Sequence, residues 1–222
     1  MSFCDRLIAE TAAERADFLS IPLIQRTLAN GAPPELYRAF LGEAYHHVKH
    51  TFPLLALAAA RTTDERYQDA LVEYMEEERG HEKWILDDIA AMGGDASAVR
   101  DGAPGFACRV MVGYAYYAIE RVSPYAMLGS IHVLEGMSVL LADRVADAVG
   151  RSLKGGSKGG FSYLRSHGGL DVEHVAFFRT LVDGIQDSDV QTIVIEQSRI
   201  FYRLYGQIFR DLDVGRSLAH AA

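Results

Sequence analysis

Apolar residues recur with the spacing of an α-helix along almost the whole chain, and no run alternates apolar and polar residues as a half-buried β-strand would. The chain has only 6 prolines in 222 residues, and most of them stand at the edges of these helical segments. The pattern predicts an all-α bundle of about seven to eight helices. The expected helices span residues 3–18, 21–30, 35–62, 64–92, 105–120, 124–150, 161–186 and 188–211.

We expect one helical domain over residues 1–222, with the last ~10 residues as a disordered tail. The glycine-rich stretch Lys154–Gly160 predicts a flexible connection before the last two helices. Only about 60 residues follow it, which is too few to form a stable second hydrophobic core of their own. The bundle is therefore expected to continue across this connection.

Charge and hydropathy argue against two classes of partner. With 30 acidic and 22 basic residues the net charge is −8, and no basic run is present that could neutralise nucleic-acid phosphates. The longest apolar run, Leu54 to Ala60, is too short to cross a membrane, and the N-terminus lacks the pattern of a signal peptide. We therefore expect a cytoplasmic protein whose two cysteines, Cys4 and Cys108, are reduced.

Residues 64–92 place charged and imidazole groups on an apolar helix face. At 100° per residue the apolar stripe includes Leu71 and Tyr74, and both Glu78 and His81 fall inside it. A carboxylate in a core needs a cation, a hydrogen-bond network or a metal ion. The spacing of Glu78 and His81 is the Glu-x-x-His arrangement used inside di-metal helical bundles. Glu82 lies near the same stripe, so the choice between it and Glu78 stays open, and a solvated helix face is the alternative interpretation.

Residues 124–150 repeat this pattern. Glu135 is the one carboxylate within an apolar stripe that runs from Met127 to Val149, whereas Asp143 lies on the opposite face. A buried salt bridge is the alternative explanation of Glu135. His132 stands at the edge of the stripe, a position typical of a packed core histidine.

The third group lies in residues 161–186. His167, Asp171 and His174 occupy positions i, i+4 and i+7, which stacks all three on one helix face. Two imidazoles and a carboxylate form a ligand set that iron and manganese prefer and that zinc also accepts. Incidental histidines near a helix start are the alternative. Taken with the two earlier helices, three carboxylates and three histidines resemble a non-haem dinuclear site more than a structural zinc site, which would favour cysteines.

Residues 35–62 supply the candidate catalytic residues. Glu43, His47 and His50 share one side of this helix and are candidates to line a substrate cavity, with Glu43 or His47 as proton carriers. A hydrogen-bonded polar core is an equally open interpretation. We expect a kink at Pro53, because it cannot donate a hydrogen bond to the carbonyl of Lys49.

Three motifs give the chain a family resemblance over nearly its whole length. They are Glu77-Glu-Arg-Gly-His81-Glu-Lys-Trp84, Leu134-Glu135-Gly and Ser166-His167-(x3)-Asp171-(x2)-His174. With these motifs the chain resembles haem-oxygenase-like (TenA/PqqC-like) helical proteins, and more narrowly their di-iron oxidase branch, often labelled iron-containing redox enzymes. The resemblance implies two irons per chain, with manganese or zinc as substitutes. Its implied ligands are Glu78, His81, Glu135, His167, Asp171 and His174.

The same resemblance implies an O2-dependent oxidoreductase that acts on a small organic substrate held against residues 35–62. Two other functions stay open: a metal-independent TenA/PqqC-type enzyme of cofactor metabolism, and a metal-binding protein without turnover. Thiaminase-type TenA proteins use a cysteine nucleophile, and Cys108 lies in no matching motif. Haem oxygenases bind haem through a histidine near the N-terminus, and the first 45 residues here contain none.

The last predicted helix, residues 188–211, has more apolar surface than one contact stripe requires. Its large apolar residues are Ile195, Ile200, Phe201, Leu204, Tyr205, Ile208 and Phe209. A homodimer would bury the surplus against a second copy, and a second contact within the same chain would bury it as well. We favour the homodimer.

Overall fold

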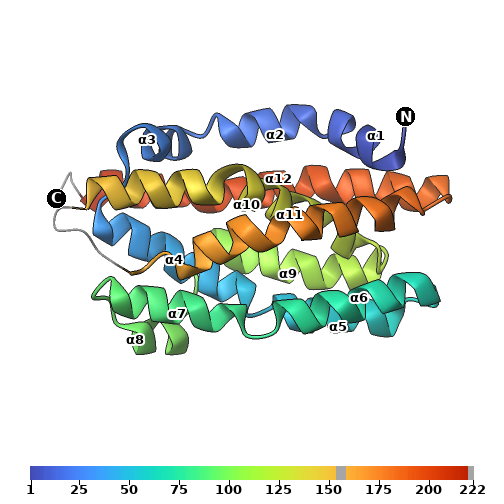
Figure 1. The fold of residues 1–222 in the computed structure, drawn as a ribbon, viewed down its shortest axis with the longest axis horizontal. Coiled ribbons are helices and arrows are strands. Elements are labelled where there is room, and N and C mark those ends of the chain that lie inside the picture. The colour runs from blue at the N-terminus through green and yellow to red at the C-terminus, as the bar shows by residue number, and fades with distance from the viewer. Residues whose placement is uncertain (154–158, 220–222) are drawn as a thin grey trace.

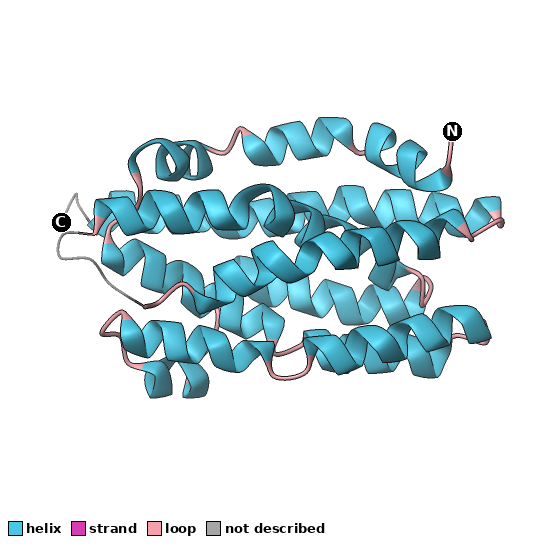
Figure 2. Cartoon of the chain, in the orientation of Figure 1, coloured by secondary structure: helices cyan, strands magenta, loops and turns pink. Residues whose placement is uncertain are grey.

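The computed structural model describes the backbone of residues 1–153 and 159–219, together with their side chains except those of residues 167–173 and 215–219. This part of the chain is helical and contains no strand, as Figure 2 shows, so the all-α prediction is confirmed. The helices are α1 (Phe3–Glu10), α2 (Ala12–Leu19), α3 (Pro22–Asn30), α4 (Pro34–Val48), α5 (Thr51–Arg61), α6 (Glu65–Glu78), α7 (His81–Ala91), α8 (Ala96–Asp101), α9 (Phe106–Arg121), α10 (Ala126–Ser152), α11 (Ser162–Asp183) and α12 (Ser188–Ala219).

The long helix α10 lies at the centre of the bundle, where it packs against α11, α12, α3 and α9. Figure 1 shows α1 to α3 along one edge of the molecule and α5 to α8 along the opposite edge, with the remaining helices between them. By length and composition α10 could also cross a membrane, since its most apolar window has a mean hydropathy of 1.3. Half of that window is buried inside the bundle, and a core helix needs the same apolar composition.

The expected seven to eight helices are an undercount, because twelve are present in the described residues. Three of the expected helices are each divided in two, and the short α8 was not predicted. Residues 35–62 form α4 and α5, which are separated at Lys49 and His50. Pro53 falls in the first turn of α5, where backbone N–H groups have no acceptor within the helix. A helix break thus takes the place of the kink expected at Pro53.

The break between α6 and α7 depends on Gly80. Its φ of +95° is a left-handed conformation that side chains make unfavourable. The expected single helix over residues 64–92 therefore ends at Glu78 and a new helix begins at His81. The two residues were expected one turn apart on one ridge, and they instead lie on either side of a turn.

The C-terminal helix α12 extends to Ala219, beyond the end predicted at residue 211 and into the segment expected to be a disordered tail. Its apolar surface is covered within the chain. Ile195, Phe201 and Ile208 are buried, and Leu204 and Phe209 pack against the core. The apolar surplus on which the homodimer prediction depended therefore has an explanation inside one chain.

His132 is packed between helices, as predicted for a core histidine. Its Nε2 lies 3.3 Å from Thr11 Oγ1, and its ring stacks on Phe178. The Thr11 hydroxyl donates to the Leu7 carbonyl, so the His132 nitrogen is the donor of the pair. Burial, and to a smaller degree Arg15, lowers the His132 pKa to about 4. The side chain is neutral at pH 7 and serves packing.

Asp88 fixes the start of α11. This buried carboxylate of α7 accepts hydrogen bonds from the Ser162 N–H at 2.9 Å, the Ser162 hydroxyl at 2.7 Å and the Tyr163 N–H at 2.8 Å. The first N–H groups of a helix have no partner within it, and a negative charge suits the positive end of the helix dipole. The predicted connection just before this point, Lys154–Gly160, lies outside the described residues at positions 154–158. Asp88 therefore positions α11 from the α7 side.

Replacing Asp88 with asparagine should destabilise the protein by about 2–3 kcal/mol. The donors at Ser162 and Tyr163 would lose a charged acceptor, and the NH2 group of the asparagine side chain would face one of these donors. Urea unfolding measures this change. Asp87→Asn is the matched control, since Asp87 is the exposed neighbour on the same helix. Because α11 also carries predicted metal ligands, iron affinity should fall in Asp88→Asn and stay unchanged in Asp87→Asn. Equal stability of the two variants would contradict a role for Asp88 in holding α11.

Candidate metal centre

Three helices bring carboxylate and imidazole groups together in the core. Glu78 is the last residue of α6, Glu135 lies in the middle of α10, and His174 lies in α11. One ligand atom of each lies within 4.8 Å of one ligand atom of the others. The apolar stripes of these helices turn toward the same core, so the three groups meet although the chain separates them widely. Glu78, and not Glu82, belongs to this cluster.

His81 adjoins the cluster through Glu78. Its Nδ1 lies 3.2 Å from Glu78 Oε2, and both side chains are buried. The imidazole stacks on Trp84, with ring centroids 4.2 Å apart. The turn at Gly80 thus leaves Glu78 and His81 in contact, even though they do not share one helix as expected.

His174 is held between two carboxylates. Its Nε2 lies 2.8 Å from Glu77 Oε2, and its Nδ1 lies 3.8 Å from Glu135 Oε1. Metal-ligating histidines commonly donate their other ring N–H to a carboxylate, which fixes the tautomer and the ring orientation. Glu77 is suited to that role, with Nδ1 left to face the cluster. Helical spacing did not point to Glu77, since it lies 100° away from Glu78 on an ideal helix.

Tyr74 is a second residue of the site that we did not predict to have a role there. It is buried one turn before Glu78, its ring lies edge-on to His174, and its hydroxyl has no hydrogen-bond partner in the described part of the chain. Burial, followed by the nearby Glu135, Glu77 and Glu78, holds the Tyr74 pKa well above its ordinary value. The phenol therefore keeps its proton and can donate a hydrogen bond toward the cluster.

The two remaining predicted ligands, Asp171 and His167, lie in α11 about one and two turns before His174. Their side chains fall outside the described residues, so their positions relative to Glu78 and Glu135 stay a prediction. The helical backbone itself is continuous from Ser162 to Asp183, as the i, i+4, i+7 spacing requires.

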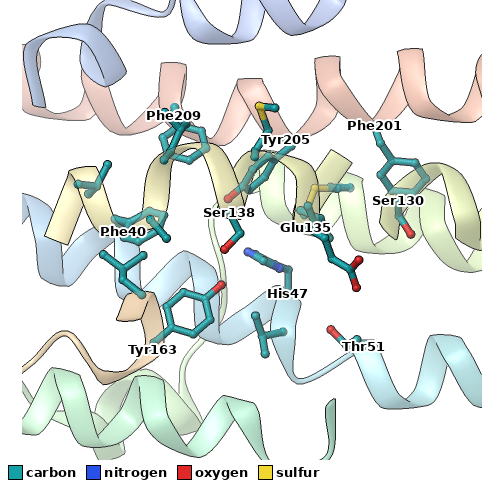
Figure 3. Close-up of a pocket in the computed structure, with 18 of the residues that line it drawn as sticks. Phe40, His47, Thr51, Ser130, Glu135, Ser138, Tyr163, Phe201, Tyr205 and Phe209 are labelled. Atoms are coloured by element: carbon teal, nitrogen blue, oxygen red, sulfur yellow. The ribbon is translucent and has the colours of Figure 1, made fainter. Parts of the chain in front are cut away.

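A cavity of about 180 Å³ adjoins the cluster, and Glu78 and Glu135 form part of its wall. Figure 3 shows His47, Ser138 and Glu135 between two aromatic ends, with Phe40 and Phe209 at one end and Phe201 at the other. Residues from α3, α4, α5, α9, α10, α11 and α12 also contribute to the wall. The cavity therefore connects the carboxylates to a long apolar space inside the bundle.

The three candidate catalytic residues lie in different surroundings. His47 lines the cavity, edge-on to Tyr205 at a centroid distance of 5.8 Å. Glu43 accepts hydrogen bonds from the Gly105 N–H at 2.9 and 3.2 Å, just before α9 begins. His50 Nδ1 lies 3.0 Å from the Tyr116 hydroxyl of α9. Neither Glu43 nor His50 is among the described residues that border the cavity, so the structure brings only His47 of the three to it.

Solved structures define the class of fold. A domain of unknown function with a haem oxygenase-like fold from Shewanella denitrificans is 23% identical, with 98% of this chain and 94% of that chain covered and a TM-score of 0.86. A TenA homologue from Pseudomonas syringae is 13% identical, covering 95% and 92% of the two chains at a TM-score of 0.76. Haem oxygenase-1 from Synechocystis, solved with haem, is 11% identical, with 100% of this chain and 96% of that chain covered and a TM-score of 0.75. The fold is therefore haem-oxygenase-like.

The sequence identifies the family within that fold. Residues 38–206 match the family of iron-containing redox enzymes, a segment that makes up most of the chain and includes every residue of the cluster. The chain belongs to this family. No curated protein matches it significantly.

The residues of the cluster fit the iron that the family name implies. Two carboxylates within 4.8 Å of each other in a core repel one another unless a proton or a cation lies between them. Carboxylate oxygens and imidazole nitrogens are ligands that ferrous iron accepts. The buried Tyr74 hydroxyl, without a partner in the described residues, adds a donor that a metal-bound water or ligand would satisfy.

Proposed function

We propose that the chain is a non-haem di-iron, O2-dependent oxidoreductase that acts on a small organic substrate in the core cavity. The observation that supports this most is the position of Glu78 and Glu135, which belong both to the ligand cluster and to the cavity wall. A reactive metal there would border the space that a substrate enters. A storage site needs no such cavity.

The residues divide into three roles under this proposal. Glu78, Glu135 and His174 would hold one metal ion, and His81, His167 and Asp171 would hold the second, with Glu135 placed to contact both. Iron bound there supplies the electrons and open coordination positions that O2 reduction requires. Glu77 orients His174 through its 2.8 Å contact. His47, which lines the cavity from α4, is placed to give or take a proton there.

A cysteine-dependent reaction of the TenA type has less support. Burial, followed by Glu43, raises the pKa of the Cys108 thiol to about 12. Burial also raises the pKa of Cys4. A nucleophilic cysteine needs a lowered pKa, because the thiolate is the reactive form. Both thiols stay protonated at neutral pH.

Anaerobic loading with Fe(II), followed by addition of O2, tests the proposal. We expect up to about two irons per chain, because six ligands can serve two open sites. We also expect O2 consumption to scale with the amount of bound iron. Glu78→Gln should reduce both quantities. Glu73→Gln, an exposed carboxylate on the same helix, is the control and should reduce neither. Failure of the wild-type protein to bind iron would overturn the proposal, and iron uptake without O2 consumption would leave a metal-binding protein without turnover.

A further inference from the structure

One buried hydrogen-bond donor of the core has no acceptor in the described part of the chain. Tyr74 is 1% exposed, and its hydroxyl hydrogen-bonds to no described residue. The other fully buried tyrosine of α6, Tyr67, shows the usual arrangement, because its hydroxyl donates to the Pro124 carbonyl at 3.0 Å. A buried donor without an acceptor is costly, and phenylalanine would fill the same space without that cost. The Tyr74 hydroxyl therefore calls for an acceptor from outside the described residues.

The ring of Tyr74 is held in place by α11. It lies edge-on to His174 at a centroid distance of 6.1 Å and edge-on to Phe177 at 5.1 Å. Tyr74 stands one turn before Glu78 on α6, and it borders the core cavity together with Glu78 and Glu135. Close packing fixes the ring, so that only the O–H bond is free to turn. The hydroxyl is therefore a fixed donor in the cavity wall beside the cluster.

A metal ion held by Glu78, Glu135 and His174 would supply the acceptor. Three protein ligands leave open coordination positions, which water and other small molecules with lone pairs fill. The Tyr74 hydroxyl can only donate to such a ligand at neutral pH, because burial, followed by the charge of Glu135, holds the Tyr74 pKa well above its ordinary value. Donor and acceptor would then satisfy each other inside the cavity.

We propose that Tyr74 donates a hydrogen bond to a small ligand in an open coordination position of the metal ion that Glu78, Glu135 and His174 hold. This role rests on the proposed function only in requiring a metal ion at the cluster, and it does not depend on O2 reduction. A tyrosine that instead supported a carboxylate ligand would change the affinity for the metal ion. A tyrosine that contacts the small ligand changes the affinity for that ligand, so the two roles can be measured separately.

Cobalt(II) and azide test the proposal without O2 chemistry. Cobalt(II) accepts the carboxylate and imidazole ligands that iron(II) accepts, and its visible absorption changes when azide binds to it. One titration gives the affinity of the protein for cobalt(II), and a second gives the affinity of the loaded protein for azide. Tyr74→Phe should bind azide at least about tenfold more weakly, because a hydrogen bond to a charged acceptor is lost. Its affinity for cobalt(II) should be unchanged.

Thermal unfolding of metal-free protein separates this role from packing. Tyr74→Phe should keep the wild-type Tm or raise it, because it removes a buried hydroxyl without a partner. Tyr67→Phe is the matched control, since it makes the same change two turns earlier on α6. It loses the hydrogen bond to Pro124 and should lower Tm by about 2–4 °C. Tyr67 is not among the described residues that border the cavity, so the affinities for cobalt(II) and azide should not change in this variant.

Several results would overturn the role of Tyr74. A lower Tm of metal-free Tyr74→Phe would show that the hydroxyl has an acceptor on the chain, for example Asp171, whose side chain lies outside the described residues. Weaker cobalt(II) binding in Tyr74→Phe would make Tyr74 a support of a protein ligand. Equal azide affinity in Tyr74→Phe and wild type, or no azide binding to either, would exclude the contact. Tyr74→Leu, which also lacks the hydroxyl, replaces Tyr74→Phe if that variant does not fold.

The same measurements distinguish this role from the proposed function. A wild-type protein that binds neither cobalt(II) nor iron(II) would reject both. A protein that consumes O2 but shows no effect of Tyr74→Phe on azide affinity would keep the oxidoreductase and reject only the role of Tyr74. The expected loss of azide affinity in a protein that consumes no O2 would keep Tyr74 as the donor and reject only the oxidoreductase.

Discussion

Replacing Glu135 with glutamine is expected to remove most of the iron that the chain binds. Glu135 faces His174 at 3.8 Å and belongs to the cluster with Glu78, so a bridging carboxylate at this position would contact both ions. Loss of a residue that only supports a ligand typically costs 10- to 100-fold in metal affinity, and loss of a bridging ligand should cost at least about that much. Iron content after anaerobic loading and desalting measures the effect.

Asp143→Asn is the control, because Asp143 is exposed on the same helix and the variant removes one carboxylate in the same way. It should bind as much iron as the wild-type protein. In metal-free protein the loss of Glu135 should be favourable, and the free energy of unfolding should rise in Glu135→Gln but not in Asp143→Asn. The reason is that Glu135→Gln relieves the repulsion between core carboxylates. Unchanged iron content in Glu135→Gln would remove Glu135 from the site.

Iron binding should also weaken as the pH falls, because protons compete with the metal ion for the histidine and carboxylate ligands. Titration of iron content between neutral and mildly acidic pH measures this loss. The same titration on Glu135→Gln shows whether the iron it retains is held by the same histidines.

Gly129→Ala is expected to lower stability more than an ordinary substitution in a helix. A Cβ at Gly129 would lie 2.6 Å from Gln197 Cβ and 2.8 Å from the backbone nitrogen of Ser198. Because that neighbour is the backbone of α12, α10 and α12 would have to move apart. We expect a loss of about 3 kcal/mol, or roughly 6–12 °C in Tm for a chain of this size. Thermal unfolding followed by circular dichroism measures it.

Gly113→Ala is the matched control for Gly129→Ala. Gly113 lies inside α9, and a Cβ there would meet nothing within 4 Å. Alanine should therefore stabilise this helix by up to about 1 kcal/mol. The two substitutions make the same chemical change and should shift Tm in opposite directions. Similar shifts in both variants would show that the close contact of α10 with α12 is not what makes Gly129 necessary.

Helical periodicity was enough to find the central part of the candidate site. Glu78 and Glu135 are polar residues on apolar stripes, and a face that is otherwise apolar turns toward the core whichever helices pack there. His174 was found by its helical spacing from His167 and Asp171. That reasoning needs only the rotation of 100° per residue. It also predicted the all-α class, because no segment has the two-residue period of a strand.

The same reasoning failed where a side chain depends on a neighbouring helix. Glu43, His47 and His50 share one side of an ideal helix, yet only His47 of the three borders the cavity in the described residues. The break at Lys49 and His50 turns the chain, and the start of α9 offers Glu43 the Gly105 N–H. Neither this break nor this hydrogen bond can be predicted from the spacing of polar and apolar residues in residues 35–62.

Glu77 shows the limit within the site itself. It lies beside Glu78 in the sequence and points away from the stripe on an ideal helix. Because α6 ends at Glu78 and α11 crosses nearby, Glu77 reaches the far nitrogen of His174. Only the placement of α11 against the end of α6 could show this contact.

The sequence by itself determined the helical class, the family motifs and the faces that turn inward, because these follow from local spacing and residue chemistry. The tertiary structure decided which helices meet, where the long helices break and which inward-facing groups touch. It also decided that the space beside Glu78 and Glu135 stays open along α10. The physical reason is that a cavity is what packing leaves unfilled, and packing depends on distant segments whose crossing no local period describes.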